Sequence, residues 1–122
     1  MTWRIGDNGF EMTLSAKVPE LIRERLRDWL TNWLAGLGLS IGQIASWAIH
    51  PGGPRILAAC GNACGLEDSA LQVSAGVLSE FGNMSSPTIL FILDRLQRQS
   101  AGAPCVALAF GPGLTIEAAL LG

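Results

Sequence analysis

Apolar and polar positions divide the first third of the chain into a short strand and a long helix. Over residues 10–14 they alternate with period two, which predicts a half-buried strand after a turn at 6–9. Over residues 19–37, apolar residues recur at helical spacing and charged residues fill the opposite side, which predicts an amphipathic helix. Ser40 and Gln43 have capping-box spacing and predict a short turn after this helix.

The middle of the chain predicts a buried strand, a glycine turn and two helices. Residues 46–50 are mostly apolar and break into a Pro-Gly-Gly-Pro turn at 51–54, after which a helix is expected to begin. We interpret the turn glycines as allowing backbone conformations that other residues avoid. Gly65 is expected to end this helix, and residues 69–81 predict the next one.

The last third of the chain predicts one helix and two strands. Ser86 is a suitable N-cap for an amphipathic helix over 87–99, and residues 105–110 and 114–121 read as strands joined by a tight turn. Strands separated by helices are typical of an α/β domain in which helices pack on a sheet. We see no repeat and no linker, so residues 1–122 are expected to form a single domain.

Composition and charge narrow the classes of function. The 122 residues are 49% hydrophobic and only 15% charged, against about 25% in a typical domain, so part of the surface is expected to meet protein. The net charge is −2 and the eight basic residues are scattered, which argues against nucleic-acid binding. There is no apolar run of membrane-spanning length and no signal-like N-terminus, so we expect a cytoplasmic protein that does not bind membranes.

His50 and Asn83 are the candidates for chemistry. His50 is the only histidine, and an ordinary imidazole can give and take protons near neutral pH. The alternatives are a structural histidine that caps the glycine turn and an asparagine that serves only a turn. Together, the two side chains offer hydrogen-bond donors for an oxyanion, such as the enolate formed when a malonyl thioester loses CO₂.

A nucleophile and a metal site are not evident. Cys60 and Cys64 lie four residues apart on a predicted helix, and with one histidine in the chain they cannot complete a typical zinc site. We interpret both as buried, reduced thiols and expect Cys105 in the core. Gln72 replaces the first glycine of a serine-hydrolase elbow, and no glycine-rich phosphate loop is present. The sequence therefore indicates only part of an active site.

The segments that hold these candidates, residues 47–54, 77–86 and 110–115, closely resemble the C-terminal half of type III polyketide synthases, the chalcone and stilbene synthase family. Their order and intervals match as well, and the resemblance covers essentially the whole chain. It implies a thiolase-like fold in which two similar βαβαββ halves pack in five layers, each half being a mixed β-sheet with helices packed on it. It also implies a homodimer that uses acyl-CoA and malonyl-CoA as substrates and needs no cofactor.

The resemblance further implies an activity and roles for named residues. Members of the family load an acyl-CoA starter on a cysteine, decarboxylate malonyl-CoA, join the fragments by Claisen condensation and cyclise the product. His50 would be the catalytic histidine and Asn83 the catalytic asparagine, and both would bind the thioester carbonyl and stabilise the enolate. His50 would also assist formation of the nucleophilic thiolate.

Substrate-binding residues follow from the same resemblance. The backbone after Gly52 and Gly53, at Arg55, would contact the pantetheine arm of CoA. Met12 falls where plant members place a gatekeeper phenylalanine, ahead of a shared Val-Pro pair. The residues that would shape the cavity are Ser85 and the turn formed by Gly111, Pro112 and Gly113.

The chain departs from the family in its length and its cysteines. Family members are much longer, and their nucleophilic cysteine lies in an N-terminal half that this chain lacks. We therefore expect a C-terminal domain that needs the N-terminal half as its partner and is inactive in condensation alone. The alternatives are a non-catalytic interaction domain and a small CoA-binding or malonyl-decarboxylating module. In each case the isolated chain is expected to expose an apolar face and to self-associate.

Overall fold

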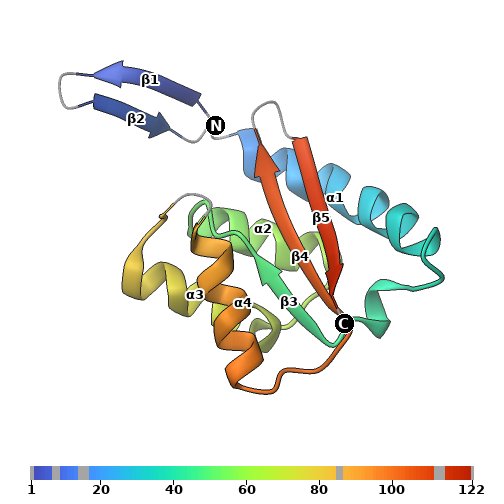
Figure 1. Ribbon diagram of the computed structural model, residues 1–122. Helices are drawn as coiled ribbons and strands as arrows, with labels where there is room; N and C mark the ends of the chain where they lie inside the picture. The colour runs from blue at the N-terminus through green and yellow to red at the C-terminus, as the bar shows by residue number, and fades with distance from the viewer. Residues whose placement is uncertain (1, 7–8, 14–16, 85–86, 112–114, 122) are drawn as a thin grey trace.

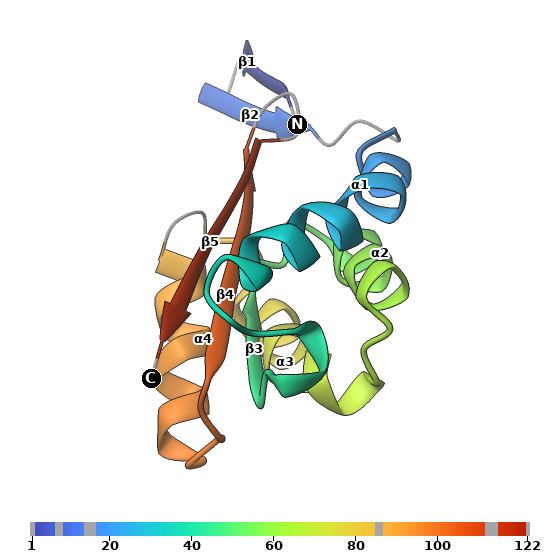
Figure 2. The ribbon, with the colours of Figure 1, turned by 90° about the vertical axis from the view of Figure 1, so that its right-hand side faces the viewer.

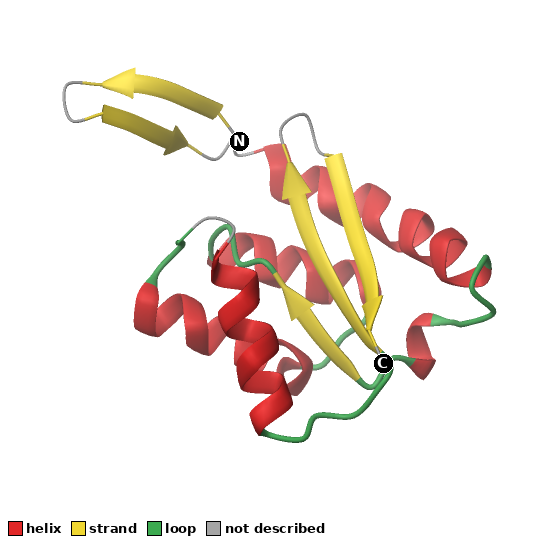
Figure 3. Ribbon diagram, viewed as in Figure 1, coloured by secondary structure: helices red, strands yellow, loops and turns green. Residues whose placement is uncertain are grey.

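The computed structural model describes residues 2–6, 9–13, 17–84, 87–111 and 115–121, with side chains from residue 18 onward. Helices cover both faces of a central sheet, and an N-terminal hairpin lies beside one end of it (Figures 1 and 3). In chain order, the elements are β1 (Thr2–Gly6), β2 (Gly9–Thr13), α1 (Lys17–Ala35), the short 3₁₀ helix η1 (Ile41–Gln43), β3 (Ser46–Ile49), α2 (Pro54–Cys64), α3 (Asp68–Phe81), α4 (Pro87–Arg98), β4 (Cys105–Gly111) and β5 (Thr115–Leu121).

The central sheet is mixed and has the strand order β3-β4-β5. β3 and β4 are parallel, with Ser46 opposite Cys105, whereas β4 and β5 are antiparallel, with Cys105 opposite Leu121. The long connection from β3 to β4 contains α2, α3 and α4, as parallel pairing requires. The predicted α/β class with helices packed on a mixed sheet is therefore confirmed.

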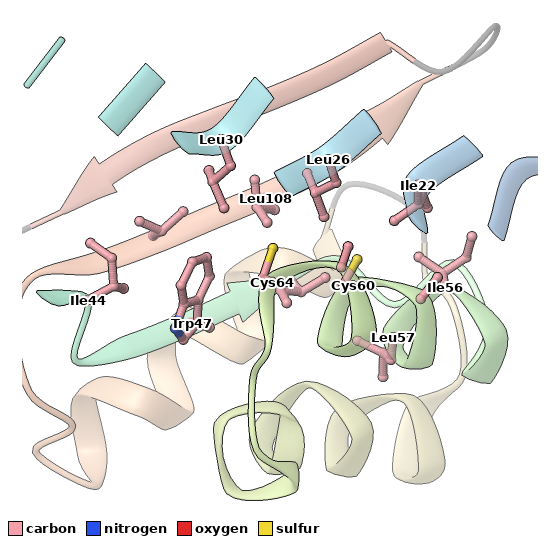
Figure 4. Close-up of a cluster of buried hydrophobic side chains, with 14 of the residues drawn as sticks. Ile22, Leu26, Leu30, Ile44, Trp47, Ile56, Leu57, Cys60, Cys64 and Leu108 are labelled. Atoms are coloured by element: carbon pink, nitrogen blue, oxygen red, sulfur yellow. The ribbon is translucent and has the colours of Figure 1, made fainter. Parts of the chain in front are cut away.

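One face of the sheet packs against α1 and α2. The buried stripe of α1 consists of Ile22, Leu26, Leu30 and Leu34, each fully shielded from solvent. These side chains pack into a cluster with residues of α2, β3 and β4 (Figure 4), among them Trp47, Ile49, Ile56, Val106 and Leu108. The predicted amphipathic helix is confirmed, and its apolar stripe is part of the core.

The other face of the sheet packs against α3 and α4. Ala48 of β3 belongs to this second cluster, together with Val77, Ile92 and Leu96. Neighbouring residues of a strand point to opposite faces of the sheet. Trp47 and Ile49 therefore pack in the cluster with α1 and α2, and Ala48 packs in the cluster with α3 and α4. β3 is buried on both faces, which explains why three of its four residues, Trp47, Ala48 and Ile49, are apolar.

The ends of the helices largely follow the predicted signals. Pro54 is the first residue of α2, and Gly65 ends it in the left-handed conformation with φ +66°. The backbone N–H of Ser40 donates to Oε1 of Gln43 at 2.9 Å, which confirms the predicted capping box at the start of η1. The interpretation of the turn glycines is wrong. Gly53 has an extended backbone with φ 161°, and Gly52 has no φ in the left-handed region.

The N-terminal hairpin contains one strand that the sequence analysis did not predict. β1 and β2 are antiparallel, with Thr2 opposite Thr13 and Gly6 opposite Gly9. The strand predicted over 10–14 is β2, one residue earlier, whereas no strand was predicted for β1, which has the same length of five residues. The rest of the predicted turn between them, and the predicted N-cap Ser86, lie outside the described residues.

Candidate functional site

The carboxyl ends of β3 and β4 lie at the same end of the sheet because the two strands are parallel. His50 directly follows β3, and Gly111 is the last residue of β4. The backbone N–H of His50 donates to the carbonyl of Leu108 at 2.8 Å and continues the ladder by one residue. This bond holds the His50 backbone against β4 at the point where the chain turns towards α2 (Figure 1).

α3 anchors the other side of β3 next to His50. The backbone N–H of His50 points to β4, so the N–H of the preceding residue, Ile49, points away from β4. The Ile49 N–H donates to Oγ of Ser74 at 3.1 Å, and both Ile49 and Ser74 are fully buried. The Ser74 hydroxyl therefore accepts the hydrogen bond that a further strand beside β3 would accept in a larger sheet. This role of Ser74 was not predicted from the sequence, because a buried serine on a helix is equally compatible with simple packing.

Replacing Ser74 with alanine is expected to lower the free energy of unfolding by about 1–3 kcal/mol, because the buried N–H of Ile49 loses its acceptor. Urea unfolding followed by circular dichroism measures the change. Ser79→Ala is the matched control, since Ser79 is exposed on the same helix and the change should stay within about 0.5 kcal/mol. Equal stability of the two variants would contradict the anchoring role of Ser74.

The imidazole of His50 is uncharged near neutral pH. It is partly buried, and this burial lowers its pKa below the ordinary value of 6.5. A neutral imidazole carries a proton on one ring nitrogen and can accept one at the other. His50 can therefore donate a hydrogen bond to an oxyanion without itself being a cation.

The glycine turn leaves the start of α2 open. The N–H of Gly52 donates to the carbonyl of His50 at 3.1 Å, and the N–H of Ile56 donates to the carbonyl of Gly53 at 3.1 Å. A Cβ atom at Gly53 would meet nothing within 4 Å, and its backbone is extended, so the fold itself does not require glycine there. Arg55 is exposed in the first turn of α2. The positive end of the helix dipole favours an anionic ligand at this point.

Asn83 lies in the exposed loop between α3 and α4. Gly82 ends α3 with φ +71°, a conformation that favours glycine, and its N–H donates to the carbonyl of Leu78 at 2.9 Å. After Asn83, the N–H of Met84 donates to Oγ1 of the buried Thr88 at 2.7 Å. Met84 also packs on the cluster that contains Ala48 of β3. Both sides of Asn83 are therefore fixed, and Thr88 is a second supporting residue that the sequence analysis missed.

These loops gather at one end of the sheet. In Figures 1 and 2, the chain after β3, the loop before α4 and the end of β4 lie at this end, and so does the hairpin that holds Met12 in β2. The structure places the predicted site residues on or beside these elements: Met12 in β2, His50 directly after β3, Gly52 and Gly53 in the turn before α2, Arg55 in the first turn of α2, Asn83 between α3 and α4, and Gly111 at the end of β4. Ser85, Pro112 and Gly113, and the side chain of Met12, lie outside the description.

The three cysteines lie away from this end or face the core. The sulfur atoms of Cys60 and Cys64 point from α2 towards α1 (Figure 4), and both side chains are buried. Burial raises the pKa of Cys64 to about 11 and, with the neighbouring Cys64 as a further cause, raises that of Cys60 above its ordinary value. Cys105 is only partly buried and is the first residue of β4. It lies about 20 Å from Gly111, the last residue of that strand, at 3.3 Å per residue.

Within the described residues, no group of three His, Cys, Asp or Glu side chains could hold a metal ion.

Labelling with a thiol-specific disulfide reagent at pH 8 is expected to distinguish these cysteines. Cys105 should react first, whereas Cys60 and Cys64 should react at least about tenfold more slowly, because their thiolates form rarely and are shielded. Mass spectrometry of peptides after timed labelling measures each site, and labelling in denaturant is the control. Rapid native labelling of Cys60 would contradict its inert, structural role.

A family model described as chalcone and stilbene synthases, C-terminal domain, matches residues 1–122. The chain belongs to the chalcone and stilbene synthase family. It is 42% identical over 122 residues to 1,3,6,8-tetrahydroxynaphthalene synthase of Streptomyces peucetius subsp. caesius, covering 98% of this chain and 32% of the relative. It is 37% identical over 120 residues to the alpha-pyrone synthesis polyketide synthase-like Pks18 of Mycobacterium tuberculosis, covering 95% of this chain and 30% of the relative.

The fold agrees with this membership. The crystal structure of PKS-I from the brown alga Ectocarpus siliculosus superimposes with a TM-score of 0.91 and 30% identity, over 98% of this chain and 34% of that one. The chain is thus the C-terminal domain of a type III polyketide synthase with a thiolase-like fold, and it spans about a third of the length of the relatives it matches. None of the described helices combines the length and hydropathy that crossing a membrane requires.

Proposed function

We propose that this chain is the C-terminal catalytic part of an acyltransferase that condenses malonyl-CoA with an acyl-CoA starter. The observation that carries the proposal is the joint anchoring of the loops that hold His50 and Asn83. The end of β3 is bonded to α3 through Ser74, and Met84, next to Asn83, packs on the cluster around Ala48 of β3. In a polyketide synthase domain, two such donors at the end of a sheet suit the stabilisation of an enolate.

Decarboxylation is the step in which these donors act. The bond between the carboxylate and the α-carbon of the malonyl thioester breaks, CO₂ leaves, and the electron pair forms an enolate with its negative charge on the thioester oxygen. The N–H of the neutral His50 imidazole and the carboxamide NH₂ of Asn83 would donate to this oxygen. Both donors are placed before the charge develops, so the transition state is stabilised more than the substrate.

Carbon–carbon bond formation needs an acyl group that this chain does not itself carry. The enolate carbon would attack the carbonyl of an acyl thioester, and the thiolate would leave. Cys60 and Cys64 are unsuitable as that thiol because their pKa values are raised and they face the core. A cysteine in the part of the relatives that this chain does not cover would carry the starter, so the chain alone is proposed to be inactive in condensation.

The CoA thioester is proposed to approach over the glycine turn. Gly53 leaves open space in front of α2, and the backbone at Gly52 and Arg55 is available to the pantetheine arm. Ser85, Met12 and the turn at 111–113 would shape the acyl cavity. The complete protein would act as a cytoplasmic homodimer on acyl-CoA and malonyl-CoA without a cofactor.

The test is a fusion in which this chain replaces the C-terminal third of the Streptomyces tetrahydroxynaphthalene synthase. We expect ¹⁴CO₂ release from carboxyl-labelled malonyl-CoA by the fusion and a loss of at least about 100-fold for this chain alone. The parent enzyme and the unfused chain are the controls. A folded fusion that releases no CO₂ under conditions in which the parent enzyme does would refute the proposed function.

A further inference from the structure

Thr88 is a polar side chain in an otherwise apolar stripe of α4. The buried positions of this helix are Thr88, Ile92 and Leu96, which lie four residues apart on one face. Ile92 and Leu96 pack in the cluster that contains Ala48 of β3, and Thr88 is fully shielded from solvent. An apolar side chain is the ordinary choice at such a position, because a buried hydroxyl is costly unless it forms a hydrogen bond. The hydroxyl of Thr88 therefore needs a specific reason.

This hydroxyl bonds the loop before α4 and not the helix itself. Its Oγ1 accepts from the backbone N–H of Met84 at 2.7 Å. α4 begins at Pro87, so Met84 lies three residues before the helix. The N–H groups left without a partner at the start of a helix belong to its own first residues, and this bond satisfies none of them. The bond therefore does not cap α4 but ties the preceding loop to it.

The bond holds the chain next to Asn83. On one side, the N–H of Gly82 donates to the carbonyl of Leu78 at 2.9 Å, and on the other, the N–H of Met84 donates to Thr88. The first bond belongs to the end of α3, whereas the second attaches the loop to α4. Asn83 is exposed, and these two bonds fix the backbone from which its carboxamide extends.

A second buried hydroxyl supports the other candidate donor in the same way. Among the described residues, three polar side chains are buried, and Thr88 and Ser74 are the two that are fully shielded. Ser74 accepts from the N–H of Ile49, the residue before His50. Each candidate donor is thus next to a backbone N–H that a buried hydroxyl holds. This parallel connects the Thr88 hydroxyl with the site as well as with the fold.

We propose that Thr88 is a positioning residue for decarboxylation, because its hydroxyl holds the loop that presents the Asn83 carboxamide to the enolate oxygen. This inference rests on the proposed function. Thr88 is shielded from solvent and does not touch the substrate; it acts through Met84 and Asn83. A donor stabilises the transition state only when it is held at hydrogen-bonding distance from the developing charge. A less constrained loop therefore slows the chemical step without weakening substrate binding.

Thr88→Val in the fusion tests this role, because valine has nearly the shape of threonine and lacks the hydroxyl. We expect kcat for release of ¹⁴CO₂ from malonyl-CoA to fall about tenfold, with KM within about twofold of the parent fusion. Thr88→Ser keeps the hydroxyl and should keep kcat within about twofold. Thr31→Val is the matched control, since Thr31 is exposed on α1, and its kcat should not change. Circular dichroism establishes folding, and Thr88→Ala replaces the valine variant if that variant does not fold.

A double variant separates positioning from a general effect on the fold. Thr88→Val added to Asn83→Ala should slow the fusion by less than about twofold more, because the loop then has no carboxamide to present. A further tenfold loss in the Asn83→Ala background would show that Thr88 does not act through Asn83, and the proposal would be wrong.

Amide hydrogen exchange, followed by NMR on the 122-residue chain, gives a measurement that does not depend on activity. The N–H of Met84 should exchange at least about fivefold faster in Thr88→Val than in the wild type, while the N–H of Ile49 keeps its rate. An unchanged exchange rate at Met84 would overturn the proposal. A wild-type fusion that releases no CO₂ refutes the proposed function as well, whereas an active fusion in which Thr88→Val keeps its kcat refutes only the role of Thr88.

Discussion

Replacing His50 or Asn83 with alanine in the fusion is expected to slow release of ¹⁴CO₂ from malonyl-CoA by about 100- to 1,000-fold. Each substitution removes one hydrogen-bond donor to the developing enolate oxygen, and the loss of a single such donor typically has this effect on turnover. The change should lie mainly in kcat, because the donors act on a charge that is absent from the bound substrate. Initial rates at saturating malonyl-CoA measure it.

Asn62→Ala is the matched control for the asparagine, since Asn62 is exposed on α2 and lies away from the loops that hold the site. The decarboxylation rate of this control should stay within about twofold of the rate of the parent fusion.

The double variant, with both His50 and Asn83 replaced by alanine, should lose less decarboxylation rate than the product of the two single losses. The reason is that the effects of residues that act on one atom are not additive. A folded Asn83→Ala fusion that decarboxylates at the parental rate would remove Asn83 from the proposed mechanism.

Replacing Leu30 with alanine is expected to lower the free energy of unfolding by about 2–5 kcal/mol. Leu30 is fully buried in α1 and packs between the sheet and α2, next to the sulfur-bearing face of α2 (Figure 4). The substitution removes apolar surface and leaves a cavity that helices packed on a sheet cannot fully close. Because domains of this size have about 5–15 kcal/mol of stability, the variant should unfold at much lower urea concentration.

Leu90→Ala is the control for this change, because the same side chain is removed from a 65% exposed position on α4. Alanine is the best helix former, so the stability of this variant should change by less than about 0.5 kcal/mol. The measurement is the linear extrapolation of urea unfolding for both variants. A loss below about 1 kcal/mol for Leu30→Ala would show that α1 is not an integral part of the core.

Helices could be predicted well because their signals are local. The four-residue recurrence from Ile22 to Leu34 records which side of α1 is buried, and Pro54 and Gly65 mark the two ends of α2. The turn before α2 was the exception, because the sequence alone does not give the backbone conformation of its glycines. Gly53 suggested special backbone geometry, but its φ is extended.

The candidate site was predicted in its residues but not in its supports. His50 was recognisable because it is the only histidine, and Asn83 because it lies in a segment that resembles the family. Ser74 and Thr88 hold the backbone on either side of the site through hydrogen bonds to Ile49 and Met84. Neither bond has a sequence signature, since a buried serine or threonine on a helix is also compatible with simple packing.

The sequence by itself determined the helices, most of the strands, the family and the two candidate donors, because periodicity and motif spacing are properties of neighbouring residues. Only the tertiary structure decided that β3 pairs with β4, that Cys60 and Cys64 face the core, that burial lowers the pKa of His50 and that β5 pairs on one side only among the described strands. These features depend on which distant segments meet and on how much water they exclude. A local pattern specifies that a strand has two edges, but only the packing of the whole chain decides which of them is covered.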